Sequence, residues 1–325
     1  MDDFQGAGSD WFEKHVMDAI ENKFKISKRE SQSYKYTGID VMAKPDGSIE
    51  INQEAYKNTL EIIDIENNAD NERPLNKEEF KKFRGAAGKL TWLSECTRPD
   101  IAYDCLSMSC HNKDARIKDL KDMNKVIRKA LDHDTTVKYS KVGKLCELKI
   151  LGISDGAYLK QDEKTKSVAG RLILLSNLDE TRVTPILWKA KTIPTVCKSA
   201  KDSETRACDK TIEDSIYVAR CIREIYTGDR GDAQLKVDIV TDSQPLVDSI
   251  NSSRQVENKL LRPLIKFMKQ TLDSNMVNTI RWCDTKVCLA DALTKTGSPL
   301  TPAMMDVVKI NKMLDLSWSD KKSRK

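Results

Sequence analysis

Histidine is scarce in this chain of 325 residues, which contains only His15, His111 and His133. Nine cysteines are scattered along the sequence without a Cys-x-x-Cys pair. Structural zinc sites draw on closely spaced Cys and His ligands, so these absences argue against zinc and favour reduced thiols. Any chemistry carried by the part beyond residue 133 must proceed without a histidine from that part.

Long hydrophobic runs are also missing. The longest apolar stretches, such as residues 172–175 and 186–188, fall far short of the roughly 20 residues that cross a bilayer. The acidic start Met1-Asp2-Asp3 is unlike a secretory signal. We therefore expect no membrane partner and a cytoplasmic or nuclear location. The net charge of +5 is too small to indicate nucleic-acid binding by itself.

Periodic patterns divide the chain into four predicted segments. Residues 1–70 combine a helix with a hairpin, 71–143 are mainly helical, 144–300 alternate strands with helices, and 301–325 form a helix and a basic tail. The predicted fold class is α/β, with an α+β N-terminal part.

The third segment predicts a mixed five-stranded sheet with flanking helices. Its strands are expected at 148–154, 167–176, 185–190, 235–241 and 277–283. Helices are expected over 256–272 and 289–295 in this segment, and over 55–63 in the first segment.

Four acidic residues lie at the edges of these elements: Asp155, Glu204, Asp242 and Asp291. Asp155 and Asp242 end the first and fourth strands, which are neighbours if these strands pair in parallel. Glu204 continues the apolar stripe of a helix and should face the sheet. Paired Mg²⁺ ions, with Mn²⁺ as the alternative, need carboxylates gathered from different elements in this way.

This grouping makes phosphodiester hydrolysis the leading hypothesis. Asp155 and Asp242 would be shared between two ions, while Glu204 and Asp291 would each complete one ion's ligands. One ion would activate the attacking water and the other would stabilise the departing 3′ oxygen. Taken singly, each acid is also a common cap or turn residue, as for Asp242 before Ser243, so the alternative of a purely local role stays open.

Four motifs resemble the C-terminal part of the Pol polyprotein of copia-type LTR retrotransposons. They are Thr97-Arg98-Pro99-Asp100-Ile101-Ala102-Tyr103, Ile186-Leu187-Trp188-Lys189-Ala190-Lys191, Ser203-Glu204-Thr205-Arg206-Ala207 and Leu289-Ala290-Asp291-Ala292-Leu293-Thr294-Lys295. The resemblance covers nearly the whole chain. It implies an RNase H-like domain that follows a helical connection and a reverse transcriptase palm remnant.

By that resemblance Asp155, Glu204, Asp242 and Asp291 are the metal ligands of a ribonuclease H. The implied substrate is an RNA/DNA hybrid, of which the RNA strand is cut. Lys189, Lys191 and Arg206 are candidate phosphate contacts. The stretch 198–202 is slightly longer than the corresponding stretch in the family. This extra length could displace Glu204 from the metal site.

The first eight residues look like the reverse transcriptase motif in which Asp2 and Asp3 would bind metal. Because the chain starts there, the fingers and the earlier palm aspartate are missing, and we expect no polymerase activity from this chain alone. An intact reverse transcriptase or other Pol parts are candidate partners. The alternative function is an inactive element fragment or a host-retained module that binds nucleic acid.

Overall fold

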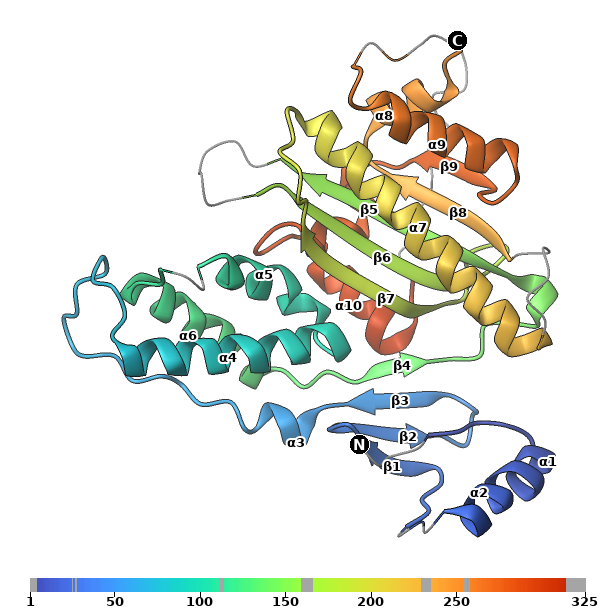
Figure 1. Cartoon of the computed structure of the whole chain (residues 1–325), viewed down its shortest axis with the longest axis horizontal. Coiled ribbons are helices and arrows are strands. Elements are labelled where there is room, and N and C mark those ends of the chain that lie inside the picture. Colours follow the sequence, from blue (N-terminus) through green and yellow to red (C-terminus); the bar gives the residue numbers. More distant parts are fainter. Residues whose placement is uncertain are drawn as a thin grey trace.

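A computed structural model describes residues 5–24, 26, 28–111, 114–158, 166–228, 235–253, 256 and 258–313. Two sheets and a group of helices make up the molecule (Figure 1). No helix in these described ranges is both long and apolar enough to cross a bilayer.

A four-stranded antiparallel sheet, in the order β1-β2-β3-β4, forms the N-terminal part. Its strands are β1 (Ser33–Tyr36), β2 (Ile39–Ala43), β3 (Ile49–Asn52) and β4 (Val137–Tyr139). The hairpin predicted in the first segment is confirmed, since β2 and β3 pair in antiparallel around the turn Pro45-Asp46-Gly47. β4 comes from the mainly helical segment 71–143, in which a short strand is expected at 136–139, and it completes the N-terminal sheet.

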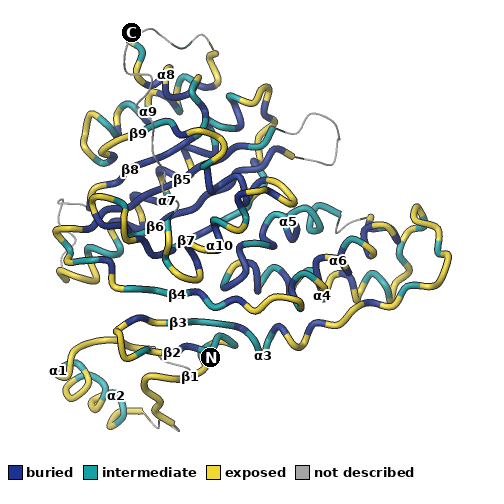
Figure 2. Tube along the Cα trace, turned by 180° about the vertical axis from the view of Figure 1, so that it is seen from behind, coloured by how far each residue is buried: buried dark blue, intermediate teal, exposed yellow. Residues whose placement is uncertain are grey.

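A short helical stretch precedes this sheet. It consists of α1 (Asp10–Phe12), the π-helical turn η1 (Glu13–Met17) and α2 (Asp18–Lys23). None of their residues is buried, and Figure 2 shows this stretch at the margin of the molecule.

Three longer helices pack beside the sheets (Figure 1). They are α4 (Lys77–Cys96), α5 (Ala102–Cys110), which follows the 3₁₀ turn η2 (Pro99–Ile101), and α6 (Ile117–Asp132). Asn76 caps α4, because its side chain accepts hydrogen bonds from the backbone of Glu78 and Glu79.

The helix predicted over 55–63 is wrong. Only α3 (Glu54–Lys57) forms, and after a turn the chain continues without regular secondary structure to a contact with α6. The Asn124 side chain of α6 accepts from the Ile63 N–H at 2.9 Å and donates to the Ile63 carbonyl at 2.8 Å. These two bonds replace the backbone bonds that a helix would have made.

The buried side chain of Arg98 links the elements of the helical group through hydrogen bonds. It is only 2% exposed, and its guanidinium group donates to both carboxylate oxygens of Asp100, at 2.8 and 2.9 Å. It also donates to the carbonyls of Lys129, Ala130 and His133 at the end of α6. Arg98 therefore supplies donors both to the carbonyl groups at the end of α6 and to the carboxylate of Asp100.

We predict that Arg98→Met lowers the free energy of unfolding by about 3–5 kcal/mol, because it leaves a buried carboxylate and three carbonyls without a donor. Urea denaturation followed by circular dichroism measures the change. The matched control is Arg73→Met, which breaks the more exposed Arg73–Glu79 pair and should lower the free energy of unfolding far less, because exposed ion pairs contribute little. Equal losses in the two variants would contradict this role for Arg98.

The second sheet has five strands in the order β7-β6-β5-β8-β9. They are β5 (Leu148–Ala157), β6 (Val168–Asn177), β7 (Val183–Thr192), β8 (Lys236–Thr241) and β9 (Thr279–Trp282). β6 pairs antiparallel with β5 and β7, whereas β8 pairs in parallel with β5 and β9. This confirms the predicted mixed five-stranded sheet with flanking helices.

Helices cover both faces of this sheet (Figure 1). The long helix α7 (Ala200–Thr227), with α8 (Gln244–Asn251) and α9 (Arg262–Asp273), packs on one face through an apolar core. The 3₁₀ turns η4 (Thr285–Val287) and η5 (Leu289–Leu293) and helix α10 (Thr301–Ile310) belong to the core on the other face. A short turn, η3 (Leu145–Glu147), leads into β5.

Two predicted helices of this part differ from the structure. The helix expected over 256–272 begins at Arg262, where Pro263 occupies the first turn and needs no backbone donor. The helix expected over 289–295 is the shorter 3₁₀ turn η5. Ala102 of α5 is buried in the same core as η5 and α10, so the helical group and the five-stranded sheet share apolar contacts.

Candidate metal centre

The parallel pairing of β5 with β8 sets the first two carboxylates side by side. Ser154 lies opposite Thr241 in the register, and the next residue on each strand is an aspartate, Asp155 and Asp242. Their predicted adjacency is confirmed. Both lie where the parallel strands end, the edge at which open α/β sheets place their sites.

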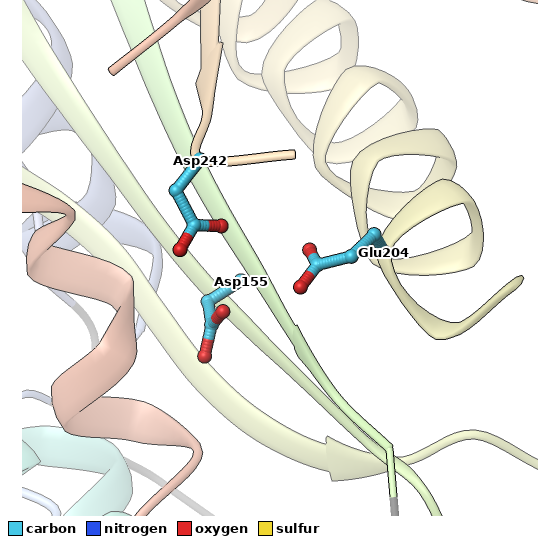
Figure 3. Close-up of side chains that lie close together, drawn as sticks. All are labelled: Asp155, Glu204 and Asp242. Atoms are coloured by element: carbon cyan, nitrogen blue, oxygen red, sulfur yellow. The ribbon is translucent and has the colours of Figure 1, made fainter. Parts of the chain in front are cut away.

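Glu204 reaches the same place from the first turns of α7. The Ser199 side chain caps this helix by accepting from the Asp202 N–H, and the Ser203 hydroxyl donates to the Gly156 carbonyl at 2.9 Å. The longer stretch at 198–202 therefore does not displace Glu204. Figure 3 shows the carboxylates of Asp155, Glu204 and Asp242 turned toward one another, and their ligand oxygens lie within 4.8 Å of each other.

Gly156 allows this close approach of strand and helix. A Cβ atom at that position would lie 2.5 Å from the Glu204 nitrogen and 2.6 Å from the Ser203 carbonyl carbon. Both are backbone atoms that cannot rotate away. Only glycine lets the helix that carries Glu204 pass so near the strand that carries Asp155.

Asp291 does not join these three carboxylates. It lies in η5, is 4% exposed, and is held by its own downstream segment. Lys295 donates to its Oδ1, and the Ser298 hydroxyl donates to its Oδ2 at 2.6 Å. Of the four predicted ligands, the structure brings three together and leaves the fourth in an ion pair.

The electrostatics of the group are those of crowded, buried acids. Burial, reinforced by the Asp242 charge, raises the pKa of Asp155 to about 6, although a hydrogen bond from Thr294 opposes the shift. Burial and then the charges of Asp155 and Asp242 raise the pKa of Glu204 to about 9. Burial also raises the pKa of Asp242. Three negative charges are therefore costly here without a cation.

Two oxygen atoms of the group lack any protein donor. The Glu204 Oε2 and Asp242 Oδ1 atoms are buried without a hydrogen-bond partner. A buried acceptor without a donor costs about 1–3 kcal/mol, and more when it is charged. Three clustered carboxylates, two of which have a buried oxygen without a donor, fit a hard divalent cation such as Mg²⁺ or Mn²⁺, which takes oxygen ligands.

The predicted phosphate contacts differ in their surroundings. The Arg206 Nε atom donates to Asp202, which is fully buried, at 2.7 Å, so that guanidinium group is tied to its own helix. The Lys191 ammonium group lies 3.0 Å from Glu95 of α4. Lys189 and Lys191 border a cavity of about 110 Å³ between β7 and helices α4 and α5. Asp2 and Asp3 lie outside the described residues.

Both tryptophans of the sheet serve packing and hydrogen bonding. Trp188 is 6% exposed and donates to the Ser94 carbonyl at 2.7 Å, which joins β7 to α4. Trp282 is half-buried and donates to the Asp242 carbonyl at 3.0 Å. The second bond fixes the backbone of a predicted ligand.

Several residues of the site were missed by the sequence prediction. They are Gly156, which admits the helix, and Thr294, Lys295 and Ser298, which hold carboxylates. The signal for Thr294 and Lys295 was present, because both directly follow Asp291 within a quoted motif. A hydroxyl group and an amine next to an acid are common, so spacing alone does not reveal what they contact.

No protein-family model matches the sequence, and no curated protein matches it. Among solved structures, an RNase H1 isolated from compost by a metagenomic approach is similar, at 14% identity and a TM-score of 0.33 over 45% of this chain and 91% of that one. The N-terminal RNase H domain of a Mycobacterium tuberculosis protein gives 17% identity and a TM-score of 0.32, over 45% of this chain and 91% of that one.

A longer stretch of the chain is similar to the foamy viral protease-reverse transcriptase, solved in complex with an RNA/DNA hybrid. The identity is 10% and the TM-score is 0.38, over 78% of this chain and 29% of that chain. This chain thus spans less than a third of that protein. Each of these proteins is similar to this chain in fold alone.

We predict that Gly156→Ala separates Glu204 from Asp155 and weakens the binding of Mn²⁺ by at least about tenfold, as do other changes that misplace metal ligands. Isothermal titration calorimetry with Mn²⁺ measures the affinity. The control is Gly85→Ala on α4, where a Cβ would meet nothing within 4 Å. That variant should bind Mn²⁺ like the parent and be about 0.5–1 kcal/mol more stable. Parental affinity in Gly156→Ala would contradict the close-approach argument.

The metal-free chain should lose stability as the pH rises. Asp155 and Glu204 have folded-state pKa values of about 6 and about 9, above their ordinary values of 3.8 and 4.5. Raised carboxyl pKa values favour folding when the groups are protonated, so this advantage disappears as pH increases through those folded values. Urea midpoints in EDTA at pH 5, 7 and 9 test the trend, and Glu204→Gln should flatten it between pH 7 and 9. A parent curve as flat as that of Glu204→Gln would refute the assignment.

Proposed function

We propose that this chain is a divalent-metal-dependent ribonuclease H that hydrolyses the RNA strand of an RNA/DNA hybrid. The observation that carries the proposal is the convergence of Asp155, Glu204 and Asp242 from β5, α7 and the end of β8. Their raised pKa values and unpaired oxygens favour a site that is made to receive cations.

The carboxylates would have different roles in that site. Asp155 and Asp242, side by side at the ends of parallel strands, would be shared between two Mg²⁺ or Mn²⁺ ions, and Glu204 would complete the ligands of one. When bound, the ions supply Lewis-acid activation of water and neutralise the charge that builds at phosphorus. Asp291 would be a further ligand of a cation if Lys295, whose side chain is 52% exposed, released that carboxylate.

The protein also holds protons and geometry in place. The Thr294 hydroxyl donates to Asp155 Oδ2, which orients that carboxylate toward its neighbours. Burial opposes the charge of Lys295, but its hydrogen bond to Asp291 and the nearby charges of Asp155 and Asp242 outweigh burial and raise its pKa. Lys295 therefore stays a cation at neutral pH and balances part of the negative charge.

Basic side chains on β7 favour a nucleic-acid backbone along this edge of the sheet. Lys191 lies opposite Ala169 of β6, which in turn lies opposite Gly156 of β5, and Lys189 lies two residues further along the same face. Two strand spacings separate Lys191 from the strand of Asp155, which is about 10 Å. Because side chains alternate along a strand, Lys189 and Lys191 share the face of Gly156 and not that of Asp155, so they would meet a nucleic-acid backbone where it passes the outer edge of β7.

The experiment is cleavage of a fluorescently labelled RNA/DNA hybrid by the full chain in the presence of Mg²⁺. Asp155→Asn, Glu204→Gln and Asp242→Asn should each lower the rate more than about a hundredfold, since even partners outside the ligand sphere cost 10–100-fold. Asp209→Asn is the matched control, because Asp209 is a buried acid of α7 outside the three-carboxylate group. It should cut at the parental rate.

Two outcomes would contradict the proposal. Intact hybrid RNA after incubation of the parent with Mg²⁺ and Mn²⁺ would exclude the nuclease, and salt-sensitive hybrid binding without turnover would then favour the nucleic-acid-binding module. Cleavage by Asp155→Asn at the parental rate would show that the activity does not depend on this site.

A further inference from the structure

Residues 294–298 form a short segment in which four of the five side chains donate hydrogen bonds to carboxylates, and we call this segment the clasp. Thr294 donates to Asp155, Lys295 and Ser298 donate to Asp291, and Thr296 donates to Asp104. Gly297 adopts φ +67, a left-handed conformation that turns the chain so that Ser298 faces back toward Asp291.

Asp104 is the one partner of the clasp that does not belong to the sheet domain. It lies on α5 in the helical group and is 8% exposed. Its Oδ1 accepts from the Thr296 hydroxyl at 2.8 Å, and its Oδ2 accepts from the Lys129 ammonium group of α6 at 2.9 Å. Both carboxylate oxygens are thus engaged, one toward the helices and one toward the clasp.

The helices hold Asp104 firmly. Lys129 also donates to the Asp100 carbonyl at 2.7 Å, and the Asp100 carboxylate is gripped by the buried Arg98. Hydrogen bonds to a charged acceptor are about twice as strong as neutral ones. Thr296 is therefore attached to a rigid network, although the residue itself lies at the surface.

We propose that Asp104 is a positioning residue for the metal centre and acts through Thr296. By fixing the middle of the clasp, it keeps Thr294 against Asp155 and keeps Lys295 and Ser298 against Asp291. The helical group would then be required for a well-formed metal site, in addition to supporting the fold. This inference rests on the proposed function, because it concerns the same carboxylates.

The test measures Mn²⁺ binding to the full chain without nucleic acid, by electron paramagnetic resonance titration well below the melting temperature. Thr296→Val removes the hydroxyl and keeps the size of the side chain, and it should weaken Mn²⁺ binding about tenfold, at the lower end of the range for partners of metal ligands. Thr296→Ser restores a hydroxyl and should bind like the parent.

A matched control exists at the opposite end of the sheet. Thr279 is also an exposed threonine that donates to a buried aspartate, Asp238, at 3.0 Å. Thr279→Val should leave Mn²⁺ affinity unchanged. Asp104→Asn and Thr296→Val both affect the same Thr296–Asp104 hydrogen bond. The double variant should therefore bind Mn²⁺ no more weakly than whichever single variant has the lower affinity.

Three results would overturn the inference. Thr296→Val could bind Mn²⁺ like the parent, Thr279→Val could weaken binding as much as Thr296→Val, or the double variant could show the sum of two independent losses. Each of these leaves the proposed function standing, since the parent still binds. A parent chain that binds no Mn²⁺ refutes the metal centre itself and the inference with it.

Discussion

The mutual repulsion of buried carboxylates is the constraint around which this molecule is built. Asp155, Glu204 and Asp242 come from separate elements yet share one small volume at the edge of the five-stranded sheet. Folding brings these carboxylates together although their negative charges repel one another. Burial and this repulsion raise the pKa values of Asp155 and Glu204. Without a cation this arrangement destabilises the fold. A bound cation would offset the repulsion between the carboxylates with its positive charge.

The remaining structure supplies what this gathering requires. Parallel pairing places the two aspartates in neighbouring positions, and the missing side chain of Gly156 lets α7 bring Glu204 alongside. The apolar cores on both faces of the sheet hold these elements in register. The helical group is part of the same body, since Ala102 is buried with η5 and α10 and Trp188 donates to Ser94.

The sequence predicted the features that depend on residues close together along the chain. Alternating apolar residues placed the five strands, and the acids at element ends marked the candidate site, because both depend on spacing along the chain. The helix predicted over 55–63 does not form because of a contact between residues far apart in the sequence, since Asn124 takes over the backbone bonds of Ile63. The hydrogen bonds that Lys295 and Ser298 donate to Asp291 were also not visible in the spacing of the acids. No periodicity reveals such partners.

The central claim is that three carboxylates form a divalent cation site, and diffraction from crystals soaked in Mn²⁺ tests it most directly. The account predicts an anomalous peak within about 2.0–2.3 Å of oxygens from Asp155, Glu204 and Asp242, the range of hard-cation ligation. The contradicting result is a crystal in which these three side chains are ordered and turned toward one another while no anomalous peak lies between them at millimolar Mn²⁺.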